Sequence, residues 1–167
     1  SNGTCTGCSK VCAHENYETD DICNECSLKL HVVRLKPNNN WKSGGARFAA
    51  YFFGNGEKWE DMKDIDGDGI YEVIVPNGFT KVSFCRMNGS TTENNWDNKW
   101  DQSNDENVPG IDSLQKVYLI DAYSWNKGAL DAWTTYTKAM NEYRIIYLKA
   151  HNDWKSDNAR FAARFYT

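Results

Sequence analysis

Five of the six cysteines fall within the first 26 residues, together with one histidine. Two pairs have Cys-x-x-Cys spacing, in which a tight turn directs two thiolates towards one tetrahedral metal ion. Disulfide bonds are the alternative in a secreted protein, but an odd count of five and the strain of a Cys-x-x-Cys bridge weigh against them. We therefore expect one structural zinc ion, bound by one of two ligand sets: Cys12, His14, Cys23 and Cys26, or Cys5, Cys8, Cys23 and Cys26.

Three aspartates, Asp64, Asp66 and Asp68, alternate within a segment that reads DIDGDG. This pattern is the first half of a calcium-binding loop, because alternating carboxylates can surround one cation. The twelfth position, where such a loop has a bidentate glutamate, is Val75, and the residues after the segment have the pattern of a strand. An Asp-Gly hairpin turn is therefore the favoured interpretation. Weak calcium binding, completed by Glu72, is the alternative.

Residues 94–102 read NNWDNKWDQ and place two tryptophans among polar side chains. The flat face of an indole suits the apolar C–H face of a pyranose ring, and nearby amide and ammonium groups can bond the sugar hydroxyls. Trp59, after a glycine-rich turn, has similar surroundings. Sugar stacking and filling of a sandwich end both remain open for Trp96. Structural roles are expected for three other tryptophans: Trp100, Trp125 and Trp133.

The elements that must position these side chains have the pattern of short strands. Tyr71, Val73 and Val75 share one face of an alternating segment, and turn signals such as Asn88-Gly89 separate the segments. Frequent turns between short strands predict an all-β fold, an immunoglobulin-like β-sandwich. A doubtful helix is expected at 129–140. Strands are predicted at 30–36, 46–53, 70–75, 80–87, 115–120 and 133–137.

An internal repeat sets the domain organisation. Residues 34–52 and 147–165 are identical at 12 of 19 positions with a constant offset of 113, which indicates tandem modules. Trp41 recurs as Trp154, so we expect Trp41 in the core of the module. The expected divisions are a cysteine-rich zinc-knuckle-like segment at 1–28, a sandwich module at 29–137, a linker at 138–146, and the truncated start of a second module at 147–167.

Composition excludes several classes of function. The net charge is −4, with 19 basic and 23 acidic residues spread along the chain, which argues against a nucleic-acid-binding protein. No apolar run approaches the roughly 18 residues of a membrane span. None of the three histidines has a nucleophile motif beside it, and the module is small for an enclosed glycosidase cleft. We therefore expect no catalytic activity.

A strand with Tyr51, a glycine-rich turn, Trp59, the DGDG turn, a β-hairpin and NNWDN follow one another in this chain. This order resembles the starch-binding modules of carbohydrate-binding families twenty-five and twenty-six, which are β-sandwiches attached to bacterial amylases and amylose-binding surface proteins. The resemblance covers about 30–137 and implies that Tyr51, Trp59 and Trp96 contact the sugar. The run ARFAAYFF is not a feature of those families, and the repeat has Arg164 in place of Tyr51. The implied carbohydrate-binding residues are Tyr51, Trp59, Asn95, Trp96, Asn98 and Lys99.

Residues 12–26 resemble the short CxH…CxxC repeats of large surface proteins of anaerobic bacteria, in which the CxH pair supplies half of the metal site. The two resemblances together imply a non-catalytic module that binds starch or a related α-glucan. The sequence does not determine the oligomeric state, for which a monomer is favoured. The two resemblances also imply a secreted or cell-surface location, where the module would target a parent enzyme or surface protein to polysaccharide. The alternative is a structural or adhesive repeat of a bacterial surface protein, with a protein as its partner.

Overall fold

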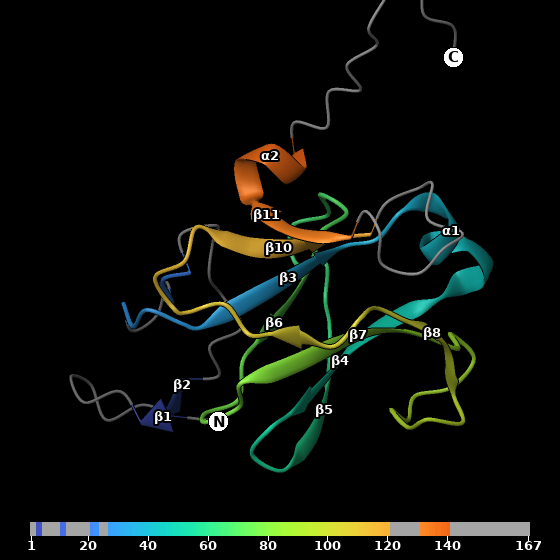
Figure 1. The fold of residues 1–167 in the computed structure, drawn as a ribbon, viewed down its shortest axis with the longest axis horizontal. Helices are drawn as coiled ribbons and strands as arrows, with labels where there is room; N and C mark the ends of the chain where they lie inside the picture. Colours follow the sequence, from blue (N-terminus) through green and yellow to red (C-terminus); the bar gives the residue numbers. More distant parts are fainter. Residues whose placement is uncertain (1–2, 5–10, 13–20, 24–26, 121–130, 141–167) are drawn as a thin grey trace, which may run out of the picture.

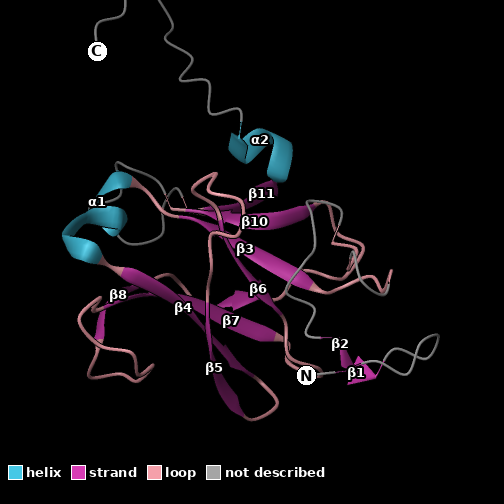
Figure 2. Cartoon of the chain, turned by 180° about the vertical axis from the view of Figure 1, so that it is seen from behind, coloured by secondary structure: helices cyan, strands magenta, loops and turns pink. Residues whose placement is uncertain are grey.

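The structure is a computed structural model that describes residues 3–4, 11–12, 21–23, 27–120 and 131–140 (Figure 1). Two β-sheets lie face to face and form an all-β sandwich, as the sequence predicted (Figures 1 and 2). Predictions that concern Cys5, Cys8, His14, Cys26, Trp125 or the second repeat copy lie outside the described residues.

The first sheet, here the β3 sheet, has the strand order β11-β10-β3-β6. Its strands are β3 (Val32–Lys36), β6 (Tyr71–Ile74), β10 (Gln115–Leu119) and β11 (Ala132–Thr135). β10 runs parallel to β3 and antiparallel to β11. The start of β3 and the end of β11 therefore lie at the same end of this sheet.

The second sheet, here the β4 sheet, has the order β5-β4-β7-β8, and β9 also pairs with β7. Its strands are β4 (Arg47–Phe53), β5 (Glu57–Asp61), β7 (Lys81–Met87), β8 (Lys99–Gln102) and β9 (Glu106–Asn107). Three short helical elements connect or follow the strands: α1 (Asn39–Lys42), η1 (Ser43–Gly45) and α2 (Tyr136–Met140). A separate antiparallel pair joins β1 (Gly3–Thr4) to β2 (Val11–Cys12).

Strand alternation divides β4 between two environments. Phe48 and Phe52 point into the core between the sheets, whereas Tyr51 belongs to a cluster on the outer face of the β4 sheet. Trp41 is buried in the same core and stacks with Phe48 at a centroid distance of 6.3 Å, so its predicted core position is confirmed. The structural role predicted for Trp133 is also confirmed, because its ring packs edge-on against two core rings, Phe84 and Tyr118.

Each of the six predicted strands overlaps an observed strand, but β1, β2, β5, β8 and β9 were not predicted. The helix expected at 129–140 is wrong over its middle, where residues 132–135 pair with β10 as β11. The β-branched side chains of Thr134 and Thr135 favour this extended backbone. Of the described residues 131–140, Tyr136–Met140 alone are helical. No helix among the described residues has the length and apolar character to cross a membrane.

The outer face of the β3 sheet carries a buried ionic network. Arg34 lies at its centre, 2% exposed, with Nη2 2.6 Å from Asp21 and Nε 3.0 Å from Glu72. Lys116 donates to the second oxygen of Asp21 at 2.6 Å. Two positive and two negative side chains give this network no net charge, and their pairing offsets the cost of removing them from water.

Residues from both sides of the predicted module boundaries contribute to this face. Cys23, from the cysteine-rich segment, is fully buried beside Leu30 and Val32. Ala139, from the predicted linker, is buried against Ile70 and Val117. Cys23 and Ala139 are thus packed onto the sandwich.

Candidate functional site

Three aromatic side chains from separate segments meet on the outer face of the β4 sheet. Tyr51 of β4 stands directly opposite Trp59 of β5 in the strand register, and their centroids are 4.9 Å apart. Trp96, from the 88–98 loop between β7 and β8, lies 4.7 Å from Tyr51 and 4.8 Å from Trp59. The ring planes are inclined by 47° to 68°. We call these three residues the aromatic cluster.

The aromatic cluster rests on an apolar floor and opens to solvent at Trp96. Ala49, Cys85 and Met87 form the floor on the outer face of the sheet and are fully buried. Tyr51 is 9% exposed, whereas Trp96 is 47% exposed. The aromatic rings of the main core are less exposed to solvent than Trp96, so Trp96 is not a core residue.

Burial also fixes the ionisation of the groups in this region. Desolvation, followed by a hydrogen bond to Glu57, raises the pKa of Tyr51, so its hydroxyl stays neutral at physiological pH. Desolvation raises the pKa of the Cys85 thiol to about 12. Neither group is poised for acid–base or nucleophilic chemistry, since both keep their protons near neutral pH.

Arg47 fastens the 88–98 loop to the sheet. Its Nε donates to the carbonyl of Thr91 at 2.6 Å and its Nη2 to the carbonyl of Glu93 at 2.5 Å. Its Nη1 contacts both Asn94 and Asp61, and the Asn94 amide donates to Asp61 at 2.9 Å. The position of Trp96 therefore depends on a guanidinium group at the start of β4.

The sequence did not assign Arg47 to the site. One signal was available, because Arg47 recurs as Arg160 within the identical run ARFAA of the repeat. Recurrence alone does not separate a packed core position from a clamp of this kind.

The three predicted polar residues divide into two groups. Lys99 lies beside the aromatic cluster, with Nζ 4.8 Å from the centroid of the Trp96 ring, and it donates to Gln102. Asn95 accepts from the backbone of Asn98 at 2.9 Å, and Asn98 donates to the carbonyl of Glu93 at 3.2 Å. These hydrogen bonds lie within the 88–98 loop, so Asn95 and Asn98 shape the loop that carries Trp96. The structure brings Tyr51, Trp59, Trp96 and Lys99 together.

Trp100, for which the sequence suggested a structural role, lies at the surface. Its side chain is 44% exposed, and the Arg86 guanidinium lies over its ring at 4.7 Å from the centroid. Trp100 is exposed because the register of β7 with β8 shifts between Arg86 and Met87.

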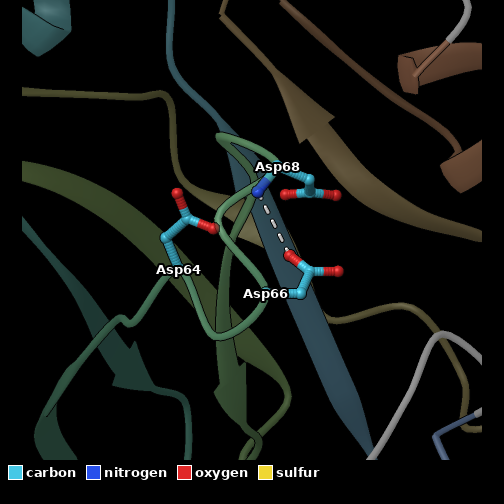
Figure 3. A group of neighbouring side chains, drawn as sticks. All are labelled: Asp64, Asp66 and Asp68. Atoms are coloured by element: carbon cyan, nitrogen blue, oxygen red, sulfur yellow. Dashed lines mark hydrogen bonds between the residues drawn. The ribbon is translucent and has the colours of Figure 1, made fainter.

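The three aspartates of the DIDGDG segment form a turn, shown in Figure 3. Asp64 accepts from the backbone of Gly67 at 2.9 Å and of Gly69 at 3.1 Å, and both glycines have positive φ. The segment closes an antiparallel bridge between Lys63 and Glu72, which confirms the predicted hairpin turn.

The carboxylates of Asp64, Asp66 and Asp68 have oxygens within 4.8 Å of one another, an arrangement that a hard cation can use. Glu72 does not complete such a site, because its carboxylate is buried and bonded to Arg34. Asp68 also accepts a hydrogen bond from the hydroxyl of Tyr136. Both oxygens of Asp64 and of Asp68, and one oxygen of Asp66, thus already accept hydrogen bonds from the protein.

Comparison of the chain with protein-family models, with curated proteins and with solved structures gives no match. The function must therefore be argued from the residues and their geometry.

Proposed function

We propose that this protein is a non-catalytic carbohydrate-binding module that holds an α-glucan on the aromatic cluster. One observation carries the proposal: three rings up to 45 positions apart in sequence meet outside the sandwich core, and the outermost, Trp96, leaves 47% of its side chain exposed. The Trp96 indole is packed against two other rings, so it already has a fixed position. A pyranose ring can therefore stack on its apolar face with little loss of side-chain conformational entropy.

The inclination of the rings favours a curved glycan over a flat one. A ribbon-like β-glucan presents its sugar faces in one plane and requires coplanar rings, whereas successive residues of an α-glucan turn along a helix. The planes of Trp59 and Trp96, the two rings of the cluster that are not buried, differ by 68°. The patch is small, so it contacts one or two sugar units.

Polar groups around the rings supply hydrogen bonds to the sugar. The Lys99 ammonium has three donors, of which Gln102 uses one. The hydroxyl of Tyr51 is hydrogen-bonded to the carboxylate of Glu57, which is a further polar group beside the cluster. A small, open site of this kind binds weakly, with a dissociation constant of roughly micromolar to millimolar, about −4 to −8 kcal/mol.

The proposal extends to the setting of the module. We place the sandwich in the immunoglobulin-like class, which two face-to-face sheets of four and five strands support. We also assign a structural zinc ion to the cysteine-rich segment and a secreted or cell-surface location to the protein. The partner is polysaccharide.

Retention on insoluble starch tests the proposal against the alternative of an adhesive repeat with a protein partner. The unmodified chain should be retained, and Trp96→Ala should reduce its affinity at least about tenfold. Leu114→Ala is the matched control, because Leu114 is an apolar residue 83% exposed on another loop.

The unfolding free energy of Trp96→Ala shows whether a loss of starch retention comes from the missing ring or from unfolding. About half of the Trp96 side chain is exposed, so its removal should cost at most about 3 kcal/mol of unfolding free energy. Passage of the unmodified chain through the column, or normal retention of Trp96→Ala, would overturn the assignment of this site.

A further inference from the structure

A second exposed indole lies on β8, at the edge of the β4 sheet. The pairing of β7 with β8 sets Arg86 opposite Asp101 and Met87 opposite Lys99, which leaves Trp100 as the extra residue of a bulge. Bulges redirect side chains and are common beside binding sites. This bulge turns Trp100 towards Arg86, and 44% of the Trp100 side chain is exposed.

Trp100 and the aromatic cluster lie on opposite faces of the β4 sheet. Along β7, Cys85 and Met87 belong to the outer floor of the cluster, whereas Phe84 belongs to the core between the sheets. Arg86 shares the orientation of Phe84 because side chains alternate along a strand. Trp100 stacks on Arg86, so its ring is a separate surface from Trp96.

The rear of the Trp100 ring is held rigidly. The guanidinium of Arg86 lies 4.7 Å from the ring centroid. Arg86 is fixed in turn, because its Nε donates to the carbonyl of Trp41 at 2.8 Å and its Nη2 to the carbonyl of Ser43 at 2.8 Å. An exposed ring that is immobilised in this way loses little conformational entropy when it binds a ligand.

Backbone without a side chain lies beside the ring at Gly44. Gly44 has φ of 67°, and a β-carbon at that position would lie 3.7 Å from the ring of Trp100. The next residue, Gly45, is packed against Gly89, where a β-carbon would come within 1.6 Å of the Gly45 carbonyl oxygen.

We propose that Trp100 is a second sugar-stacking surface and that it binds α-glucan. Its ring already has a cation over one face, so a second cation is a poor ligand, whereas the neutral C–H face of a pyranose is suitable. Nη1 of Arg86 donates to no group within the described part of the chain, so it can bond a sugar hydroxyl. This inference rests on the proposed function, because it gives a second surface the same class of ligand.

The opposed placement of the two rings decides how they act together. A short oligosaccharide cannot lie on both faces of the sheet, so each surface takes a separate ligand. A branched polysaccharide offers many chains and can engage both surfaces, which raises its apparent affinity by avidity.

Two measurements on the full chain test this inference. Calorimetric titration with maltoheptaose should give two sites for the unmodified chain and one for Trp100→Ala. Affinity electrophoresis in amylopectin should show at least an approximately tenfold weaker apparent affinity for Trp100→Ala. Trp96→Ala should also leave one site, and the double variant should leave none. Leu114→Ala again controls for loss of an exposed apolar side chain.

The possible results are distinguishable. One site in the unmodified chain, lost in Trp96→Ala and intact in Trp100→Ala, would overturn the second surface and leave the proposed function standing. An unmodified chain that binds neither ligand would overturn both. Trp100→Thr, which suits a strand, covers the case in which the alanine variant does not fold; if both variants unfold, Trp100 is structural and the inference is wrong.

Discussion

Replacement of Arg47 by alanine should release the 88–98 loop and, with it, the Trp96 surface. Arg47 is the residue whose guanidinium reaches the carbonyls of Thr91 and Glu93 and the side chain of Asn94. Its own side chain is 22% exposed, so solvent weakens these contacts only in part. The β4 backbone and the core beneath it do not depend on them.

The magnitude follows from the hydrogen bonds that join Arg47 to the loop. A charged donor contributes about 1.5–3 kcal/mol per bond when buried and nearer 1 kcal/mol when partly exposed. Three contacts with the loop therefore give about 2–4 kcal/mol, which corresponds to about a 30- to 700-fold shift in the equilibrium between a fastened and a released loop. The ion pair of Arg47 with Asp61 adds little, because Asp61 is 60% exposed.

Hydrogen exchange and starch binding together provide the assay. In Arg47→Ala, amide protection should fall within residues 88–98 and remain in β4 and β7, and starch affinity should fall at least about tenfold. Lys58→Ala removes one positive charge from the same sheet and should change neither measurement. Normal starch affinity together with unchanged protection in the loop would refute the clamp role of Arg47.

Four further predictions concern the core, the ionic network and the cysteines. Trp41→Ala should cost about 3–5 kcal/mol in urea denaturation, and a cost below about 1 kcal/mol would contradict its core position. Arg34→Met should also cost about 3–5 kcal/mol, because the buried Glu72 loses its cationic partner and Asp21 keeps only Lys116; a stability equal to that of the unmodified chain would exclude this role. The Cys85 thiol has its pKa raised to about 12, so at pH 8 peptide mapping should find it alkylated only after unfolding, and rapid native labelling would be inconsistent with its burial. Purified protein should contain about one zinc ion, which Cys23→Ser releases under either ligand set and Cys5→Ser under one of them; oxidised thiols without zinc would establish disulfides instead.

The strands that the sequence predicted are those with an apolar face towards the core. β4 reads RFAAYFF and β7 reads KVSFCRM, and both are buried through most of their length because both faces of the β4 sheet carry apolar clusters. β5 reads EKWED and β8 reads KWDQ, and both are edge strands of the β4 sheet. An edge strand is specified by backbone hydrogen bonds to its neighbour and has little need of apolar side chains, so its composition resembles that of a loop.

The candidate site, like the fold, was predictable from the sequence only in part. The resemblance selected Tyr51, Trp59 and Trp96, and the structure brings these three rings together. The clamp by Arg47 and the outward turn of Trp100 were not predictable. Both depend on contacts between residues more than forty positions apart, or on a single extra residue in a strand, and neither leaves a periodic signal in the sequence.

The parallel pairing of β3 with β10 determines how this sandwich responds to tension. Because β11 returns antiparallel to β10, the chain joins the β3 sheet at Val32 and leaves it at Thr135 from one end, with β10 between them. The two points are about 10 Å apart, two strand spacings. A pull between modules in series would load the hydrogen bonds of β11 one after another, like a zipper, while the β4 sheet and its rings carry no force. A glycan on the aromatic cluster would thus stay bound while β11 separates from the β3 sheet.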